Sequence, residues 1–108
     1  MATEYTVRFV AKVVRELMAT IKENPRLART YTRPVYGGLV IKVELTGDSQ
    51  WSLSVGTMDT TPPEDGLLAG LAGELQLAGE WERESQTKRG HREALHTATI
   101  KWRELVEA

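Results

Sequence analysis

Apolar residues near the start of the chain recur at the spacing of an α-helix. At about 100° per residue they fall on one broad arc of a helix that runs from about Thr3 to Glu23. The residues of this arc are Val7, Val10, Ala11, Val13, Val14, Leu17, Met18 and Ile21. The alternation among the first residues also permits a short strand there, but the unbroken arc favours one helix. Asn24 and Pro25 end it, because the residue before a proline is pushed out of the helical region.

The middle of the chain alternates apolar and polar side chains, which is typical of strands with one buried face. This alternation covers residues 39–45 and, after the turn sequence TGDS, residues 51–55. The pattern predicts a β-hairpin. The preceding sequence, RLARTYTRPVYGG, predicts an edge strand over residues 28–33 that Pro34 interrupts.

A second helix is predicted over residues 62–79. Thr61 and Glu64 have the spacing of a capping box, and Pro62 would occupy the first helical position, where its missing N–H does no harm. Leucines gather on one side of this helix, at positions 67, 68, 71 and 75. An alternative remains open in which Leu75, Leu77 and Trp81 alternate in a strand.

Three glycines form a strip beside these leucines. Gly66, Gly70 and Gly73 each weaken a helix by up to about 1 kcal/mol relative to alanine. Their presence on one strip indicates that another backbone approaches the helix closely there.

The segment TKRGHREALHTATIKWREL, residues 87–105, predicts a third helix. On a helical wheel its apolar residues and Trp102 form a continuous arc of about 140°. A strand is the alternative, because His96, Ala98, Ile100 and Trp102 alternate with polar residues, but it leaves the helix-forming stretches REAL and WREL unexplained. The predicted fold class is therefore α+β in a single domain, residues 1–108. It has an N-terminal helix, a small antiparallel sheet built on the hairpin at 39–45 and 51–55, and two C-terminal helices packed on one side.

The two histidines do not form a metal-binding pair in this helix. His91 and His96 are five residues apart, or about 140° around a helix, whereas metal-binding pairs use a spacing of four. His91 falls on the apolar arc, which favours a partly buried ring, and His96 falls on a polar edge. Glu93 and His96 have the E-x-x-H spacing of di-iron bundles, but such sites need two copies. No metal and no cofactor are predicted.

Composition narrows the classes of function. The 108 residues include no cysteine, which excludes disulfides, thiolate zinc sites and cysteine nucleophiles and suits a reducing compartment, so we expect a cytoplasmic protein. The N-terminus lacks the pattern of a signal peptide, and no run approaches the roughly 18 apolar residues of a membrane span. No G-x-G-x-x-G, P-loop or G-x-S-x-G motif occurs, and no motif assigns the chain to a family. We therefore predict a protein that is not an enzyme and does not enter a membrane.

Charge is unevenly distributed along the chain. Residues 1–33 carry seven basic and three acidic groups, residues 44–84 carry one basic and nine acidic groups, and residues 85–108 carry five and three. A dipolar molecule of this kind suits docking to a charged partner or head-to-tail self-association. Blocks of charge that cancel across the folded surface are the alternative.

Candidate contact residues lie mainly on the first helix. Its basic residues follow a four-three-seven spacing that places them on one strip, opposite the apolar arc. The arginines of the next segment, interleaved with tyrosines, could extend the strip toward phosphates and bases. Trp81, between two predicted helices, is a candidate interface residue, and three basic residues near the start of the third helix oppose its dipole. The predicted partner-binding residues are Arg8, Lys12, Arg15, Lys22, Arg29, Arg33, Trp81, Lys88, Arg89 and Arg92.

These observations predict a small non-enzymatic interaction or regulatory protein. We expect it to bind another protein, or itself as a homodimer or larger assembly, through charged helix surfaces. Its size and lack of a catalytic signature suit an accessory or mobile-element-encoded inhibitor. Nucleic-acid binding by the basic strip is the alternative, although a sequence pI of about 6.1 is low for a dedicated nucleic-acid binder.

Overall fold

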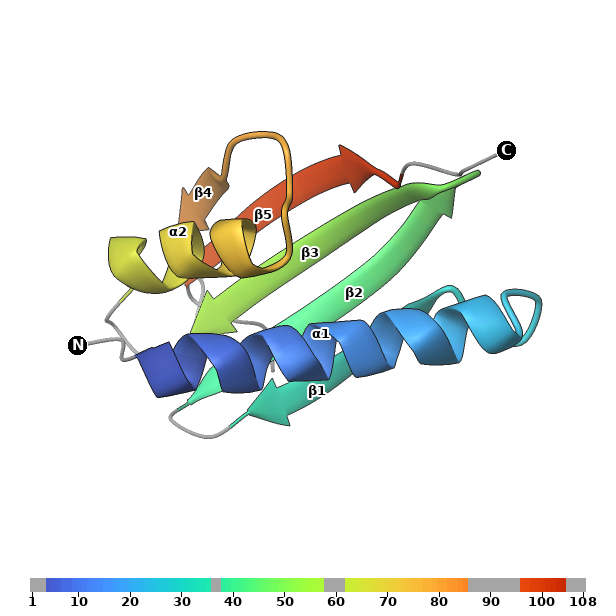
Figure 1. Ribbon diagram of the computed structural model, residues 1–108, viewed down its shortest axis with the longest axis horizontal. Coiled ribbons are helices and arrows are strands. Elements are labelled where there is room, and N and C mark those ends of the chain that lie inside the picture. Colours follow the sequence, from blue (N-terminus) through green and yellow to red (C-terminus); the bar gives the residue numbers. More distant parts are fainter. Residues whose placement is uncertain (1–3, 36–37, 58–61, 86–95, 105–108) are drawn as a thin grey trace.

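One antiparallel sheet and two helices make up the part of the chain that the computed structural model describes, residues 4–35, 38–57, 62–85 and 96–104. The elements are α1 (Glu4–Glu23), β1 (Thr30–Val35), β2 (Leu39–Gly47), β3 (Gln50–Thr57), α2 (Asp65–Glu74), β4 (Glu82–Ser85) and β5 (His96–Arg103). The strand order is β1-β2-β3-β5-β4, and every neighbouring pair is antiparallel. Both helices lie on the same face of the sheet (Figure 1). The predicted α+β class is confirmed, but the predicted pair of C-terminal helices is wrong.

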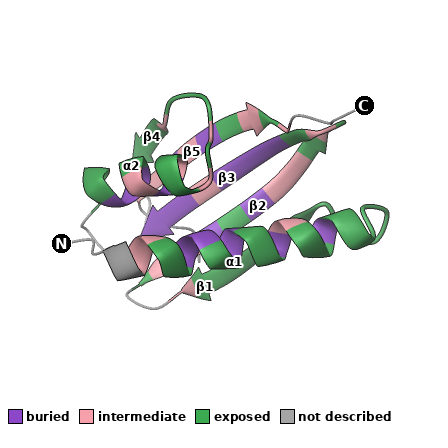
Figure 2. Ribbon diagram, in the orientation of Figure 1, coloured by how far each residue is buried: buried purple, intermediate pink, exposed green. Residues whose placement is uncertain are grey.

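The first helix is confirmed, with bounds close to those predicted. Its apolar arc faces the sheet, and Val10, Val14 and Ile21 are fully buried. In Figure 2, buried and exposed residues alternate along α1, as expected for a helix with one apolar face. No helix in the described ranges is both long and apolar enough to cross a membrane.

The predicted hairpin is also confirmed and forms the centre of the sheet. Ile41, Val43, Leu53 and Val55 are buried beneath the helices, and Ile100 continues this row on β5. The opposite face of the sheet is polar. There the Ser54 and Thr99 hydroxyls form a hydrogen bond of 3.1 Å between β3 and β5.

The predicted strand over residues 28–33 exists as β1, an edge strand that runs through Pro34 instead of stopping before it. Leu45 N–H donates to the Arg29 carbonyl. Because bonding alternates along an antiparallel pair, Thr30, Thr32 and Pro34 point their backbone groups away from β2. Pro34 therefore loses no hydrogen bond to the sheet, which explains why the strand tolerates it.

The second helix is shorter than the predicted 62–79. It begins at Asp65, with Glu64 at the N-cap position and no side-chain cap, so Pro62 precedes the helix and Thr61 lies outside the described residues. At its end Gln76 N–H donates to Gly73 and Leu77 N–H to Ala72, which is the Schellman pattern of helix termination. The alternative strand through residues 75–81 is also wrong, because this segment connects α2 to β4.

The third predicted helix is replaced by strand β5. Residues 96–103 pair with β3 along their whole length, so the alternation of His96, Ala98, Ile100 and Trp102 is that of a strand. Ala98 and Ile100 are fully buried on the helix-covered face. β-Branched threonines favour this conformation, and pairing with a buried central strand outweighs the helix propensity of the flanking residues. Residues 86–95, which include His91, Glu93, Lys88, Arg89 and Arg92, lie outside the described residues.

The glycine strip of α2 makes one close contact, to a side chain and not to a backbone. A Cβ built on Gly70 would lie 2.7 Å from Val7 Cγ2 of α1. Gly66 and Gly73 have nothing within 4 Å of such an atom. Of these three glycines, only Gly70 lies where a side chain would collide with α1.

Candidate binding cleft

A cleft opens between α1, the connection from α2 to β4, and the end of β5. Its volume is about 450 Å³. In Figure 1, α1 runs along the length of the sheet, whereas α2 covers only part of β5. The residues that line it are Arg15, Met18, Leu75, Gln76, Leu77, Ala78, Trp102, Arg103 and Glu104.

The wall of the cleft is largely apolar. Met18, Leu75, Leu77 and Trp102 are half-buried and pack against the edge of the core. Trp102 is the cross-strand partner of Trp51, which is only 2% exposed, so the half-buried ring is supported by a fully packed one. A thioether and an indole offer adaptable, polarisable contact surface.

The end of α2 supplies one side of this wall. The Schellman turn requires a left-handed residue, and Gln76 takes that conformation with φ of +54°. A non-glycine residue there is strained by about 1 kcal/mol or more. Leu75 and Leu77, which flank Gln76, both line the cleft.

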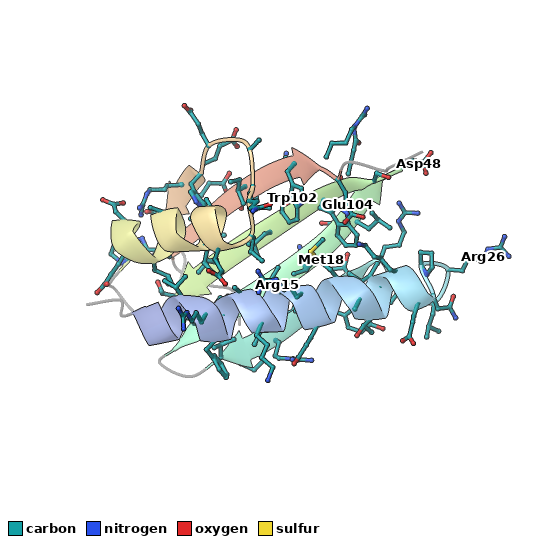
Figure 3. All side chains as sticks on the ribbon, viewed as in Figure 1. Arg15, Met18, Arg26, Asp48, Trp102 and Glu104 are labelled. Atoms are coloured by element: carbon teal, nitrogen blue, oxygen red, sulfur yellow. The ribbon has the colours of Figure 1, made fainter. Side chains whose placement is uncertain are left out.

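Two ion pairs tie α1 across the cleft. Arg15 Nη2 donates to the Glu74 carbonyl at 3.0 Å and lies 3.8 Å from its carboxylate. Lys22 Nζ lies 2.8 Å from the Glu104 carboxylate and 5.9 Å from the centre of the Trp51 ring. Arg15, Met18 and Lys22 are three and four residues apart, so they share one face of α1. Figure 3 shows Arg15 and Met18 on the side of α1 toward Trp102 and Glu104.

The sequence-predicted residues are divided among several surfaces. Arg15 lines the cleft and Lys22 pairs with Glu104 of its lining, whereas Lys12 is exposed elsewhere on α1. Arg33 pairs with Glu16 at 3.1 Å, and Arg29 Nε donates to the Leu45 carbonyl at 3.1 Å. The basic groups of α1 and β1 are thus partly used within the fold and do not form one continuous cationic surface.

Two further predicted positions lie apart from the cleft. Arg8 is exposed on α1. Trp81 is half-buried, and its Nε1 donates to the Leu68 carbonyl at 2.9 Å, so it fastens the α2–β4 connection to α2. Lys88, Arg89 and Arg92 lie outside the described residues.

Sequence reasoning missed most of the cleft. The sequence pattern places Met18 and Trp102 on buried arcs and Leu77 in a helix or, alternatively, a strand, and it marks neither Gln76 nor Glu104 as a contact residue. These residues come from three elements that are distant along the chain, and only the tertiary arrangement brings them together. The available signal was the excess of apolar residues just after α2, where a solvated connection would be polar.

A smaller hollow of about 210 Å³ lies near the edge strand β4. In it the Ser85 Oγ and His96 Nδ1 lie 2.9 Å apart. Arg83 donates to the Pro63 carbonyl and contacts Asp65, so the nearby cation is already engaged. In the described part of the chain no carboxylate bonds the second nitrogen of His96, which leaves the pair short of a catalytic triad.

The described residues contain no group of three histidine or carboxylate side chains placed to hold a metal ion. Fold and cleft together describe a two-layer α+β protein with an open apolar cleft framed by ion pairs. Comparisons of the chain with protein-family models, with curated proteins and with solved structures give no match.

Proposed function

We propose that the protein is a small non-enzymatic interaction protein that binds a segment of another protein in the cleft between α1 and the α2–β4 connection. The observation that carries the proposal is the apolar wall of Met18, Leu75, Leu77 and Trp102 beside a half-exposed arginine. Aromatic, methionine and arginine residues are the types enriched at protein interfaces.

The chemistry of the cleft favours a segment with an apolar anchor next to a carboxylate. The volume of about 450 Å³ has room for large apolar side chains. Arg15 uses one donor on the Glu74 carbonyl and has others available, because a guanidinium carries five. The one carboxylate of the lining, Glu104, already pairs with Lys22. A partner carboxylate is therefore expected to meet Arg15.

Selection from a library of random displayed peptides tests this proposal. We expect the wild-type protein to enrich peptides with an aromatic or aliphatic residue beside an aspartate or glutamate. Ala78→Glu adds a charge to the cleft wall and should abolish their binding. Ala69→Glu is the matched control, because Ala69 is equally exposed on α2 but does not line the cleft.

Replacing Arg15 by methionine should weaken the selected peptides roughly tenfold, as expected for the loss of one charge-assisted hydrogen bond. Equal binding to wild type and Ala78→Glu would exclude the cleft as the binding site. The alternative, nucleic-acid binding, predicts affinity for labelled DNA or RNA that falls with salt and is lost in Arg8→Glu with Arg15→Glu.

A further inference from the structure

The two edges of the sheet carry opposite charges. At the β1 edge, Arg29 precedes the strand and Arg33 lies within it, and Lys12 of α1 lines a small hollow beside Pro34. At the β4 edge, Glu82 and Glu84 alternate along a strand whose four residues are all exposed. Exposed edge strands are templates for pairing with another chain, and here the two templates are electrostatically complementary.

The two sets of charges lie on opposite faces of the sheet. Arg33 pairs across β2 with the buried Ile41 and contacts Glu16 of α1, so it is on the helix-covered face. On β4 the residue on that face is Arg83, which pairs with the buried Ala98. Because side chains alternate along a strand, Glu82 and Glu84 are on the open face.

We propose that copies of this chain associate head to tail, with β4 of one copy pairing antiparallel to β1 of the next. The five strands alternate in direction, so β1 and β4 of one molecule point the same way. A second copy can present β1 antiparallel to β4 only when it is turned over, with its helices on the opposite face. That turn places Arg29 and Arg33 of the second copy on the same face as Glu82 and Glu84 of the first.

Backbone hydrogen bonding fits this arrangement. Thr30 and Thr32 point their backbone groups outward from β1, as derived above from the bond between Leu45 and Arg29. On the other side of the sheet, Glu104 N–H donates to the Ser49 carbonyl, and this bond determines which residues of β5 point their backbone groups toward β3 and which toward β4. It follows from the register that Arg83 and Ser85 point their backbone N–H and C=O groups outward from β4.

One register then satisfies both edges. With Arg83 opposite Thr32 and Ser85 opposite Thr30, Glu82 faces Arg33 of the neighbouring copy. This register does not need the N–H that Pro34 lacks. A parallel arrangement would instead keep all helices on one face and place Arg33 near Arg83, where like charges repel.

Such a contact joins two different surfaces, so it repeats from copy to copy and forms a ring or an open filament. Each strand pair is short and each ion pair is exposed, so association is expected to be weak, concentration-dependent and sensitive to salt. Peptide binding in the cleft uses other residues, and the two proposals can fail independently.

Sedimentation equilibrium or light scattering across a concentration series tests the assembly. We expect the average mass of the wild type to rise with concentration. Arg29→Glu with Arg33→Glu, and separately Glu82→Lys with Glu84→Lys, should each remain monomeric. An equimolar mixture of the two variants should assemble again, because each then meets an edge of opposite charge.

Two further variants keep the test decisive. Lys101→Glu with Arg103→Glu makes the same change in net charge as the β1 variant, on exposed residues of β5 beyond its pairing with β4, and it should assemble like the wild type. Thr32→Pro removes an outward N–H without changing charge and should prevent assembly even if a charge variant folds poorly. A wild type that stays monomeric up to its solubility limit, or assembly that survives both edge changes, would overturn the proposal.

Discussion

The close approach of Gly70 of α2 to Val7 of α1 leaves no room for a side chain at position 70. We expect Gly70→Ala to destabilise the protein, whereas Gly73→Ala, one turn later on the same helix, should stabilise it. The added Cβ at position 70 would lie 2.7 Å from Val7 Cγ2 and 3.2 Å from Cγ1. At Gly73 the added atom meets nothing within 4 Å.

The sign at each position follows from two opposing terms. Alanine in place of glycine stabilises a helix by about 0.5–1 kcal/mol. At position 70 this gain opposes an overpacking cost of roughly 1–3 kcal/mol, which the stiff side chain of Val7 cannot relieve by rotation alone. We therefore expect a net loss of about 1 kcal/mol or more at Gly70, and a gain of about 0.5–1 kcal/mol at Gly73.

Chemical denaturation of wild type and both variants measures the difference in the free energy of unfolding. The cycle with Val7→Ala gives the control, because removing the two methyl groups should cancel the cost of the new Cβ and leave a favourable coupling between the two substitutions. If Gly70→Ala and Gly73→Ala stabilise the protein equally, the described contact between α2 and Val7 of α1 is incorrect.

Three other substitutions test separate parts of the fold by the same measurement. Ile100→Ala should lower the free energy of unfolding by about 2–5 kcal/mol, because the side chain is fully buried on β5; a surface-like loss below about 0.5 kcal/mol would support the helix originally predicted there. Trp81→Phe should cost roughly 1–2 kcal/mol, because it leaves the Leu68 carbonyl without the indole donor. Gln76→Gly should stabilise the protein by about 0.5–1 kcal/mol by relieving the left-handed backbone, and an unchanged or lower stability would argue against the Schellman turn.

The first half of the fold was predictable because its signals are local. The arc of α1 persists over about four turns, and the alternation from Leu39 to Val55 is broken only by a turn sequence. In both cases the pattern of buried residues and the intrinsic preference of those residues for helix or strand predict the same structure. Even Pro34, which argued for an interruption, agrees with a strand once its outward position on the edge is known.

The prediction for the second half of the chain is wrong where the local preference of the residues and their tertiary pairing disagree. Residues 96–103 satisfy the periodicity of both a helix and a strand, and the neighbouring sequence favours a helix. The deciding fact is that β3, the most buried strand, needs a partner on its second side, and that need is invisible along the sequence. Trp102 and Arg103 of β5 also line the cleft, so a sequence prediction that makes this segment a helix cannot locate the cleft.

The spacing of the basic residues on α1 predicts which of them share one side of the helix, but not what they contact. The spacing correctly indicates that Arg15 and Lys22 share one side of α1, but it does not reveal that Glu74 and Glu104 lie opposite them. Pairing within the fold places these two cations beside the cleft, and Arg15 keeps donors for a partner. The outermost strands, β1 and β4, have no neighbouring strand in the described sheet, and under the assembly proposed above the charge segregation seen along the sequence would act there between molecules. The uneven charge of the chain is therefore expected to act chiefly at the sheet edges, whereas the cleft is expected to combine apolar contact with the single guanidinium of Arg15.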